Sequence, residues 1–212
     1  LRVLSQQQVL SYGREVLSQE SQAIKEAGDR LGQSFFQAVN LLFTCKGKVV
    51  TTGMGKSGNV AQKVAATLSS TGTPSFFLHP SEALHGDFGM VGKEDCLLAF
   101  AQGGETREVL AVVQFARSMS LPVVAVTGKN TSSLASRADT CLDSGVDKEA
   151  DLWDMAPTSS STVALALGDA LAVVLMRARN FSREHFLRLH PGGRLGRSQT
   201  CTSDLMQPLS EL

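Results

Sequence analysis

The stretch Lys48-Val-Val-Thr-Thr-Gly53-Met-Gly-Lys-Ser-Gly58 decides the fold of this 212-residue chain. After Lys48 its first half is β-branched, which is typical of a buried strand. Glycines then close the strand, and residues 57–70 that follow predict a helix. A strand that leads through a glycine turn into a helix is the repeating unit of α/β proteins.

The same rhythm continues toward the C-terminus. Further strands are predicted at 75–78, 95–100, 122–127 and 140–143, and helices at 105–119, shortly after 127, and at 160–178. We therefore expect a doubly wound α/β fold, with a mostly parallel five-stranded sheet and helices on both faces. On the N-terminal side, residues 5–43 are rich in Gln, Glu, Ala and Leu and lack Pro, which predicts one or two helices.

Composition narrows the classes of function. Lys and Arg total 20, as do Asp and Glu, so the formal net charge is zero. Without a basic stripe or an acidic tail, we expect no nucleic acid and no membrane as partner. The apolar run 163–176 is shorter than the roughly 20 residues of a bilayer span, which predicts a buried core helix. Four cysteines without a CxxC pair or a close histidine predict reduced thiols in a cytoplasmic protein rather than a zinc site or a disulfide framework.

Two loops that follow predicted strands have the composition of anion sites, because ligands of open parallel sheets bind where strands lead into helices. In 53–58, glycine amides and a helix start suit a phosphate, and Lys56 can hold that phosphate or polarise a carbonyl. A plain tight turn is the alternative. The second loop is Ala101-Gln-Gly-Gly-Glu-Thr-Arg-Glu108, where Glu108 falls about one turn into a helix and can shuttle a proton, although helix capping alone also explains it. Neither loop has the glycine spacing of a nucleotide P-loop.

Two further segments carry histidines. His79 and His85 lie six residues apart after a predicted strand, a spacing more common in structural pairs than in metal sites. Near Lys56 and Glu108 they would instead contact substrate hydroxyls or a metal. His190 precedes Pro-Gly-Gly, so it is either a base on a fixed loop or part of a simple chain turn.

Taken together, these segments resemble the sugar isomerase (SIS) domain of bacterial D-arabinose 5-phosphate isomerases. The resemblance runs in order over about residues 40–197. It is carried by six motifs, Gly53-Met-Gly-Lys-Ser-Gly58, Ser70-Thr-Gly-Thr-Pro74, His79-Pro-Ser-Glu-Ala-Leu-His-Gly-Asp87, Ala156-Pro-Thr-Ser-Ser159, Gly168-Asp-Ala-Leu-Ala172 and His190-Pro-Gly-Gly193. It implies conversion between D-ribulose 5-phosphate and D-arabinose 5-phosphate for synthesis of the lipopolysaccharide sugar Kdo, and we expect a cis-enediol intermediate.

The resemblance also assigns roles to residues. The positions that match the family's catalytic set are Lys56, Glu108, Glu149 and His190. Those that match its substrate contacts are Gly72, Thr73, His79 and His85. His79 also matches a position that can carry zinc, and since the family needs no metal, we expect no required cofactor and zinc only as an inhibitor. The residues leave open whether Glu108 or His190 is the base at carbon.

By the same resemblance, the chain divides into three parts. A helical segment, 1–43, packs on an SIS domain, 44–197, and 198–212 begin a linker toward a CBS pair, whose start Ser203-Asp-Leu-Met206 resembles. Domains of this kind associate as homodimers or homotetramers, and His190 would reach the site of a neighbouring subunit.

One departure from the family concerns the phosphate loop. The usual Ser-x-Ser-Gly pattern is replaced by Ala101 and Gly103, which removes two hydroxyl donors of roughly 0.5–1.5 kcal/mol each. We expect Ser57, Thr106 and the backbone around Gly103 and Gly104 to hold the phosphate instead. The departure keeps two alternatives open, an isomerase of another sugar phosphate and a sensor without turnover. A sensor has no need for Lys56, Glu108 and His190 together, which favours the enzyme.

Overall fold

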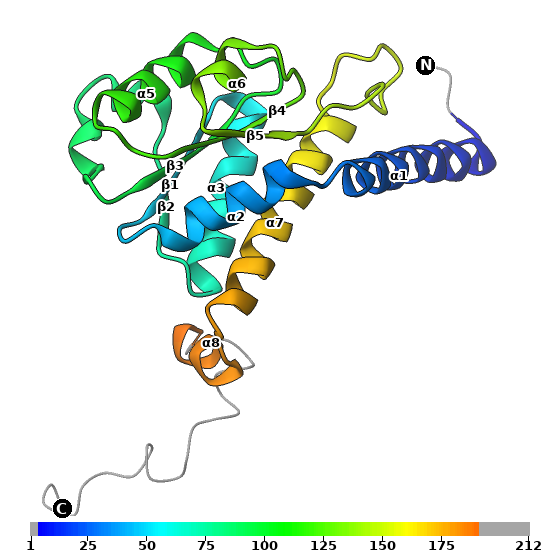
Figure 1. Ribbon diagram of the computed structural model, residues 1–212. Coiled ribbons are helices and arrows are strands. Elements are labelled where there is room, and N and C mark those ends of the chain that lie inside the picture. Colours follow the sequence, from blue (N-terminus) through cyan, green and yellow to red (C-terminus); the bar gives the residue numbers. More distant parts are fainter. Residues whose placement is uncertain (1–3, 191–212) are drawn as a thin grey trace, which may run out of the picture.

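The computed structural model describes residues 4–190 and contains a five-stranded sheet in the order β2-β1-β3-β4-β5 (Figure 1). The strands are β1 Val49–Gly53, β2 Ser75–Phe77, β3 Cys96–Phe100, β4 Val123–Thr127 and β5 Thr140–Asp143. All four neighbouring pairs are parallel, so the predicted sheet is confirmed and is entirely parallel. Residues of β1, β3 and β4 are buried throughout, as expected for strands covered on both faces.

Helices cover both faces of the sheet. One face packs on α2 (Gln33–Thr44), α3 (Gly55–Ser70) and α7 (Ser159–Ala178), and the other on α4 (Pro80–Ala83), the 3-10 turn η1 (Asp87–Met90), α5 (Arg107–Ser118) and α6 (Ser133–Arg137). Alternate strand residues separate the two cores, since Leu98 and Val124 face the first set whereas Leu97 and Val123 face the second. The doubly wound arrangement is therefore confirmed.

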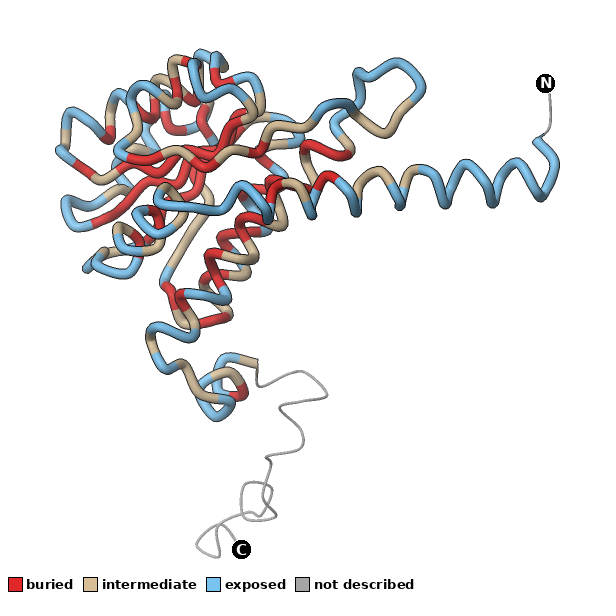
Figure 2. Tube along the Cα trace, turned by 45° about the vertical axis from the view of Figure 1, so that its right-hand side comes forward, coloured by how far each residue is buried: buried red, intermediate tan, exposed pale blue. Residues whose placement is uncertain are grey.

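Two helices reach beyond the layers. At one end is α1 (Gln6–Asp29), and at the other is α8 (Arg183–Leu189), which begins at the capping serine Ser182. Within residues 4–43, both α2 and the later part of α1 pack on the domain. Residues 4–15 are all exposed and project away from the domain (Figure 2).

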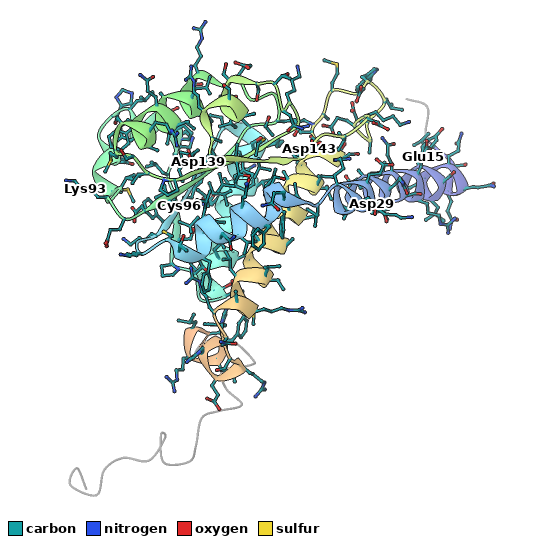
Figure 3. All side chains as sticks on the ribbon, in the orientation of Figure 1. Glu15, Asp29, Lys93, Cys96, Asp139 and Asp143 are labelled. Atoms are coloured by element: carbon teal, nitrogen blue, oxygen red, sulfur yellow. The ribbon has the colours of Figure 1, made fainter. Side chains whose placement is uncertain are left out.

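The later part of α1 is attached at several points. Ala23 and Ala27 are buried, and the Gln19 amide donates to the backbone oxygen of Glu149 at 2.9 Å. At the end of the helix, the Arg30 Nε lies 3.3 Å from Asp143, which closes β5 (Figure 3). This attachment places α1 beside the edge of the sheet where β5 ends.

Within the described residues, α7 is the one helix long and apolar enough to cross a membrane, with a mean hydropathy of 1.7 over its most apolar window. Nine of its residues are buried, from Ser159 to Leu175, and it contacts α1, α2 and α3. This is the packing of a core helix, as the sequence predicts.

The thiols within the described residues form no disulfide. Cys96 is fully buried, and Cys45 and Cys141 are half-buried. Burial raises the pKa of Cys141 to about 11 and that of Cys96 further still, so both are protonated at neutral pH. Cys201 lies outside the described residues.

Candidate active site

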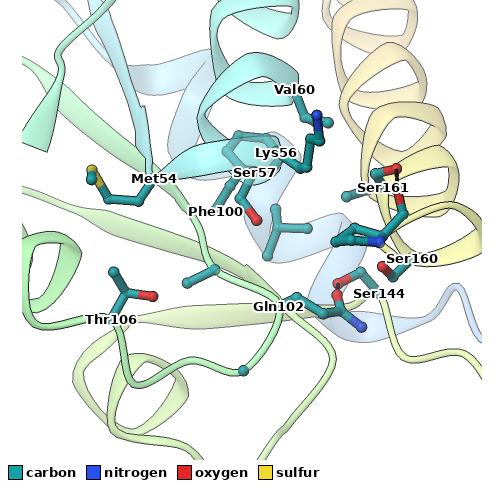
Figure 4. Close-up of a pocket in the computed structure, with 15 residues that line it drawn as sticks. Met54, Lys56, Ser57, Val60, Phe100, Gln102, Thr106, Ser144, Ser160 and Ser161 are labelled. Atoms are coloured by element: carbon teal, nitrogen blue, oxygen red, sulfur yellow. Dashed lines mark hydrogen bonds between the residues drawn. The ribbon is translucent and has the colours of Figure 1, made fainter. Parts of the chain in front are cut away.

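A cavity of about 230 Å³ opens at the carboxyl ends of the strands (Figure 4). Its walls come from the start of α3, the β3–α5 loop, the end of β5 and the start of α7. Four of the predicted site residues line it, namely Lys56, Ser57, Gly103 and Thr106. The edge of the sheet that the sequence indicates therefore carries a cavity lined by several of the predicted residues.

The electrostatics of this cavity favour an anion. Lys56 is the single charged residue among the described residues that line it. The N-termini of α3 and α5 both lie at the cavity, and neither receives a hydrogen bond from a capping side chain within residues 4–190. Two uncapped helix starts leave backbone N–H groups and positive partial charge for a ligand.

Close packing positions the first loop. A Cβ on Gly58 would lie 2.6 Å from the backbone oxygen of Gly53, so only glycine lets α3 begin so near the end of β1. This approach brings Lys56 and Ser57 to the cavity in the first turn of the helix. The Ser57 hydroxyl donates to no atom of residues 4–190, so a ligand can receive its hydrogen.

Two adjacent glycines of the second loop, Gly103 and Gly104, have different surroundings. Gly104 has a φ of 68°, and a Cβ there would lie 2.1 Å from the Ser132 Oγ. Only glycine therefore fits the backbone conformation and the close packing at this position of the loop. Gly103 is exposed, is not among the residues with positive φ, and has open space around its Cβ position. Thr106, the N-cap residue of α5, lines the cavity with a hydroxyl that bonds to no other described residue. Gly103 and Thr106 thus line the cavity, whereas Gly104 packs against Ser132.

Glu149 lies behind the cavity wall and caps α7. Its carboxylate accepts from the Thr158 N–H at 2.8 Å, the Thr158 hydroxyl at 3.1 Å, the Ser160 N–H at 3.1 Å and also the Ser160 hydroxyl. Burial would raise the pKa of Glu149, but these hydrogen bonds outweigh it and hold the pKa below its ordinary value. Because Ser160 lines the cavity, Glu149 acts on it through Ser160.

Glu108, His79 and His85 lie outside the residues that line this cavity. Glu108 is half-buried in the first turn of α5, seven residues before Phe115 and therefore on the same helix face, and the Phe115 ring stacks on Phe88 at 4.0 Å. This face of α5 is turned toward the segment that carries the two exposed histidines. No group of three His, Cys, Asp or Glu suited to a metal occurs within 4–190, so zinc at His79 stays a prediction.

Gly72, Thr73 and His190 lie at the opposite end of α7 from the cavity. Thr73 is buried and accepts from the Arg179 Nε at 3.2 Å, just after α7 ends. A Cβ on Gly72 would lie 2.3 Å from the ring of Phe181. His190 ends α8, where its Nδ1 lies 2.7 Å from the Phe186 oxygen.

The 20 residues of α7 span about 30 Å, so one chain does not bring His190, Gly72 or Thr73 to its own cavity. The loop 191–196 that follows His190 lies outside the described residues, as does the predicted linker at 198–212.

Four polar residues that line the cavity were not predicted from the sequence, namely Gln102, Ser144, Ser160 and Ser161. Ser144 follows β5 directly, Gln102 is the second residue after β3, and Ser160 and Ser161 lie in the first turn of α7. The rule that ligands bind at the carboxyl ends of parallel strands would have selected Gln102 and Ser144.

Comparison with known proteins gives the chain a family. Residues 42–174 match the SIS domain family. The curated arabinose 5-phosphate isomerase KdsD of Shigella flexneri is 49% identical over 185 residues, which cover 87% of this chain and 56% of that protein. KdsD of Pseudomonas aeruginosa is 48% identical over 178 residues, with 84% and 55% covered. The chain thus spans about half the length of the curated relatives it matches.

Among solved structures, an Escherichia coli CFT073 protein in complex with arabinose 5-phosphate superposes with a TM-score of 0.86. It is 39% identical in sequence, and the match covers 89% of this chain and 100% of that one. The sequence match covers most of the chain, and the folds agree closely. This chain therefore belongs to the SIS domain family.

Proposed function

We propose that this chain is an aldose-ketose isomerase that interconverts D-ribulose 5-phosphate and D-arabinose 5-phosphate. The observation that carries the proposal is the 49% identity, over 87% of the chain, to a curated arabinose 5-phosphate isomerase. The cavity supports it, since two uncapped helix starts and one lysine suit a small phosphorylated ligand. The role that follows is supply of the aldose phosphate for Kdo and lipopolysaccharide synthesis in the cytoplasm.

The reaction would pass through a cis-enediol. A base removes the proton from the carbon beside the carbonyl and returns it to the neighbouring carbon, while Lys56 stabilises the charge that develops on the carbonyl oxygen. Glu108 and His190 are the two candidates for the base. Glu149 would assist by holding Ser160 in the wall of the cavity.

We further propose that the active form is a homodimer or homotetramer. Within one chain, about 30 Å of α7 separate the cavity from the helix that ends at His190. If His190 takes part in the reaction, it must enter the cavity of another subunit. A site shared in this way explains why the predicted residues are divided between the two ends of α7.

The reaction is proposed to need no metal. Enediol chemistry requires a base and an electrophile, which carboxylate or imidazole and ammonium groups can supply. Zinc bound at His79 would inhibit by occupying a substrate contact.

One observation favours a second candidate, an isomerase of a different sugar phosphate. Ala101 and Gly103 leave the β3–α5 loop without the hydroxyls that a phosphate loop of this kind usually carries, although both residues line the cavity. The activity would then be the same in class and differ in the sugar.

A substrate panel tests the proposal and its alternative together. The purified chain is incubated with ribulose 5-phosphate, arabinose 5-phosphate, ribose 5-phosphate, a hexulose phosphate and a heptose phosphate, each with and without EDTA. We expect the first two to interconvert fastest, with the same rate in EDTA. Faster turnover of another sugar phosphate would replace the substrate, and turnover only after a divalent ion is restored would overturn the metal-free reaction.

A further inference from the structure

On one wall of the cavity, the hydroxyl hydrogens are already donated to other groups of the chain. Ser144, Ser160 and Ser161 form this serine wall (Figure 4). Ser144 donates to the Gln102 Oε1 at 3.1 Å, Ser160 donates to Glu149, and Ser161 donates to the backbone oxygen of residue 157 at 3.0 Å. A serine hydroxyl has one hydrogen and two lone pairs, so toward a ligand these three side chains can only accept.

The helix start behind the serine wall is equally unsuited to an anion. The carboxylate of Glu149 already takes the N–H groups of Thr158 and Ser160 at the N-terminus of α7. Unlike α3 and α5, this helix has its positive end satisfied by a charge of the chain itself. Negative charge and acceptor oxygens therefore stand where a phosphate would need donors.

Gln102 supplies a hydrogen-bond donor on this side of the cavity. Its Oε1 is taken by Ser144, and its Nε2 donates to no atom of residues 4–190. The residue is held firmly, because its backbone oxygen accepts from the Gly128 N–H at 3.0 Å and from the Thr127 hydroxyl at 3.2 Å. A Cβ on Gly128 would lie 2.4 Å from the Gln102 Nε2, so the missing side chain there makes room for the amide.

The opposite side of the cavity has the reverse character. The Ser57 and Thr106 hydroxyls bond to no other described residue, and the uncapped starts of α3 and α5 add backbone N–H groups. In Figure 4, Thr106 lies across the cavity from Gln102 and Ser144. A phosphate dianion offers only acceptors and needs this donor-rich side, whereas sugar hydroxyls both donate and accept and match the serine wall with its amide.

With the phosphate at the starts of α3 and α5, as the proposed function takes it, we infer that the sugar hydroxyls lie on the serine wall and that the Gln102 Nε2 donates to a sugar oxygen. Gln102 is then a specificity-determining residue that distinguishes one sugar chain from another. The inference rests on the proposed function, since it takes the ligand to be a sugar phosphate.

The test compares two unreactive probes on the full chain by titration calorimetry. The Kd of inorganic phosphate depends on the phosphate side of the cavity alone. The Kd of arabinitol 5-phosphate depends on both sides, and this probe has no carbonyl to isomerise. Gln102→Met removes the amide and keeps the length of the side chain. We expect the Kd of arabinitol 5-phosphate to rise about tenfold and the Kd of inorganic phosphate to stay within about twofold.

Two further variants give matched comparisons. Ser57→Ala removes a donor from the phosphate side, so both Kd values should rise by similar factors of about five to tenfold. Ser144→Ala leaves the Gln102 amide in place without its anchor, and a rise of about two- to threefold for arabinitol 5-phosphate alone is expected. Thermal unfolding of each variant separates lost contacts from lost structure.

Several outcomes would overturn the inference. If Gln102→Met raises both Kd values equally, the amide holds the phosphate, and if it changes neither, the amide contacts no ligand. If the wild-type chain prefers arabinitol 5-phosphate to phosphate but Gln102→Met and Ser144→Ala do not alter that preference, only the role of Gln102 fails. If the wild-type chain binds phosphate but shows no preference for the sugar phosphate, the proposed function fails with it.

Discussion

The two ends of α7 carry different parts of the predicted site. At its N-terminus lie the cavity, Lys56 and the Glu149 cap, with side chains that leave donors and acceptors open to a ligand. At its C-terminus, Thr73 is bonded to Arg179, and His190 stacks on Phe186 with ring centroids 4.0 Å apart. One end carries an open cavity, whereas the other is occupied by contacts within the chain.

This difference shows that a motif match and a site are not the same. The resemblance assigns substrate contact to Gly72 and Thr73, yet in one subunit these residues support the junction between α3 and the end of α7. Either a neighbouring subunit makes them part of its own site, or their role is structural. Variants at the two ends of α7 distinguish these two possibilities.

Among tests that compare the two ends of α7, the largest effect is expected from combining a variant of each end. Lys56→Met and His190→Ala should each lower kcat by roughly 10²–10³ if, as proposed, each residue acts on the reacting atoms. Mixing the two inactive proteins after partial unfolding and reassembly should restore activity, since some mixed sites carry both intact residues. The steady-state rate of the mixture measures this directly.

A matched control uses another lysine of the same helix. Lys63 pairs with Asp169 at 2.5 Å on the surface, so Lys63→Met should leave kcat within about twofold. No recovery of activity in the mixture, with both variants still assembled as oligomers, would show that His190 does not complete another subunit's site.

Thr73→Val sharpens the comparison at the far end. The variant leaves the Arg179 Nε without its partner, and we expect a loss of about 1–3 kcal/mol in the free energy of unfolding. Urea denaturation measures this loss, and KM measures whether Thr73 also contacts the substrate. An unchanged KM in the assembled enzyme would make Thr73 structural, and a raised KM would support the substrate contact implied by the family.

Gly103→Ser tests the phosphate side of the cavity. The residue has open space around its Cβ position and no positive φ, so serine fits without strain. A returned hydroxyl of about 1 kcal/mol should lower KM about fivefold and leave kcat nearly unchanged, because it binds substrate and transition state alike. Gly104→Ser is the contrasting variant, since a side chain there collides with Ser132. A raised KM in Gly103→Ser would mean that no phosphate lies beside this position.

The smallest effect is expected from the cap of α7. Glu149→Gln removes the charge beside the helix start, and we expect a loss of about 0.3–1 kcal/mol in stability at neutral pH. The folded-state pKa of Glu149 lies below its ordinary value of 4.5, so its contribution is complete above that value and is lost as the pH falls through the folded-state pKa. Denaturant melts at pH 7 and pH 3 should therefore show the difference between the two proteins shrinking. A difference that grows on acidification would contradict this cap.

Most of the fold could be predicted from the sequence because strands buried on both faces read as short apolar runs. The segment predicted at 140–143 is β5 to the residue, and 160–178 becomes α7 at Ser159–Ala178. The elements that the sequence missed are short. In α4, η1 and α8, four to seven residues contain too few turns for a helical period to appear.

The candidate site could be predicted where it depends on chain order and not where it depends on tertiary contacts. Lys56 and Thr106 could be predicted because each lies where a strand leads into a helix, Lys56 in the first turn of α3 and Thr106 at the N-cap of α5. The capping role of Glu149 rests on hydrogen bonds from residues 158 and 160, which no local sequence pattern predicts. Likewise, nothing in the sequence around His190 shows that α7 carries it away from the cavity.

Proton exchange at C2 of arabinose 5-phosphate would test whether this chain catalyses the proposed reaction. The purified wild-type chain is incubated with the sugar phosphate in D₂O containing EDTA, and the C2 proton is followed by NMR. We predict that its signal disappears as deuterium enters and that ribulose 5-phosphate forms, with Glu108→Ala slower by roughly 10²–10⁴. A C2 proton that persists while the sugar phosphate is bound would contradict the isomerase and identify a domain that binds its ligand without turnover.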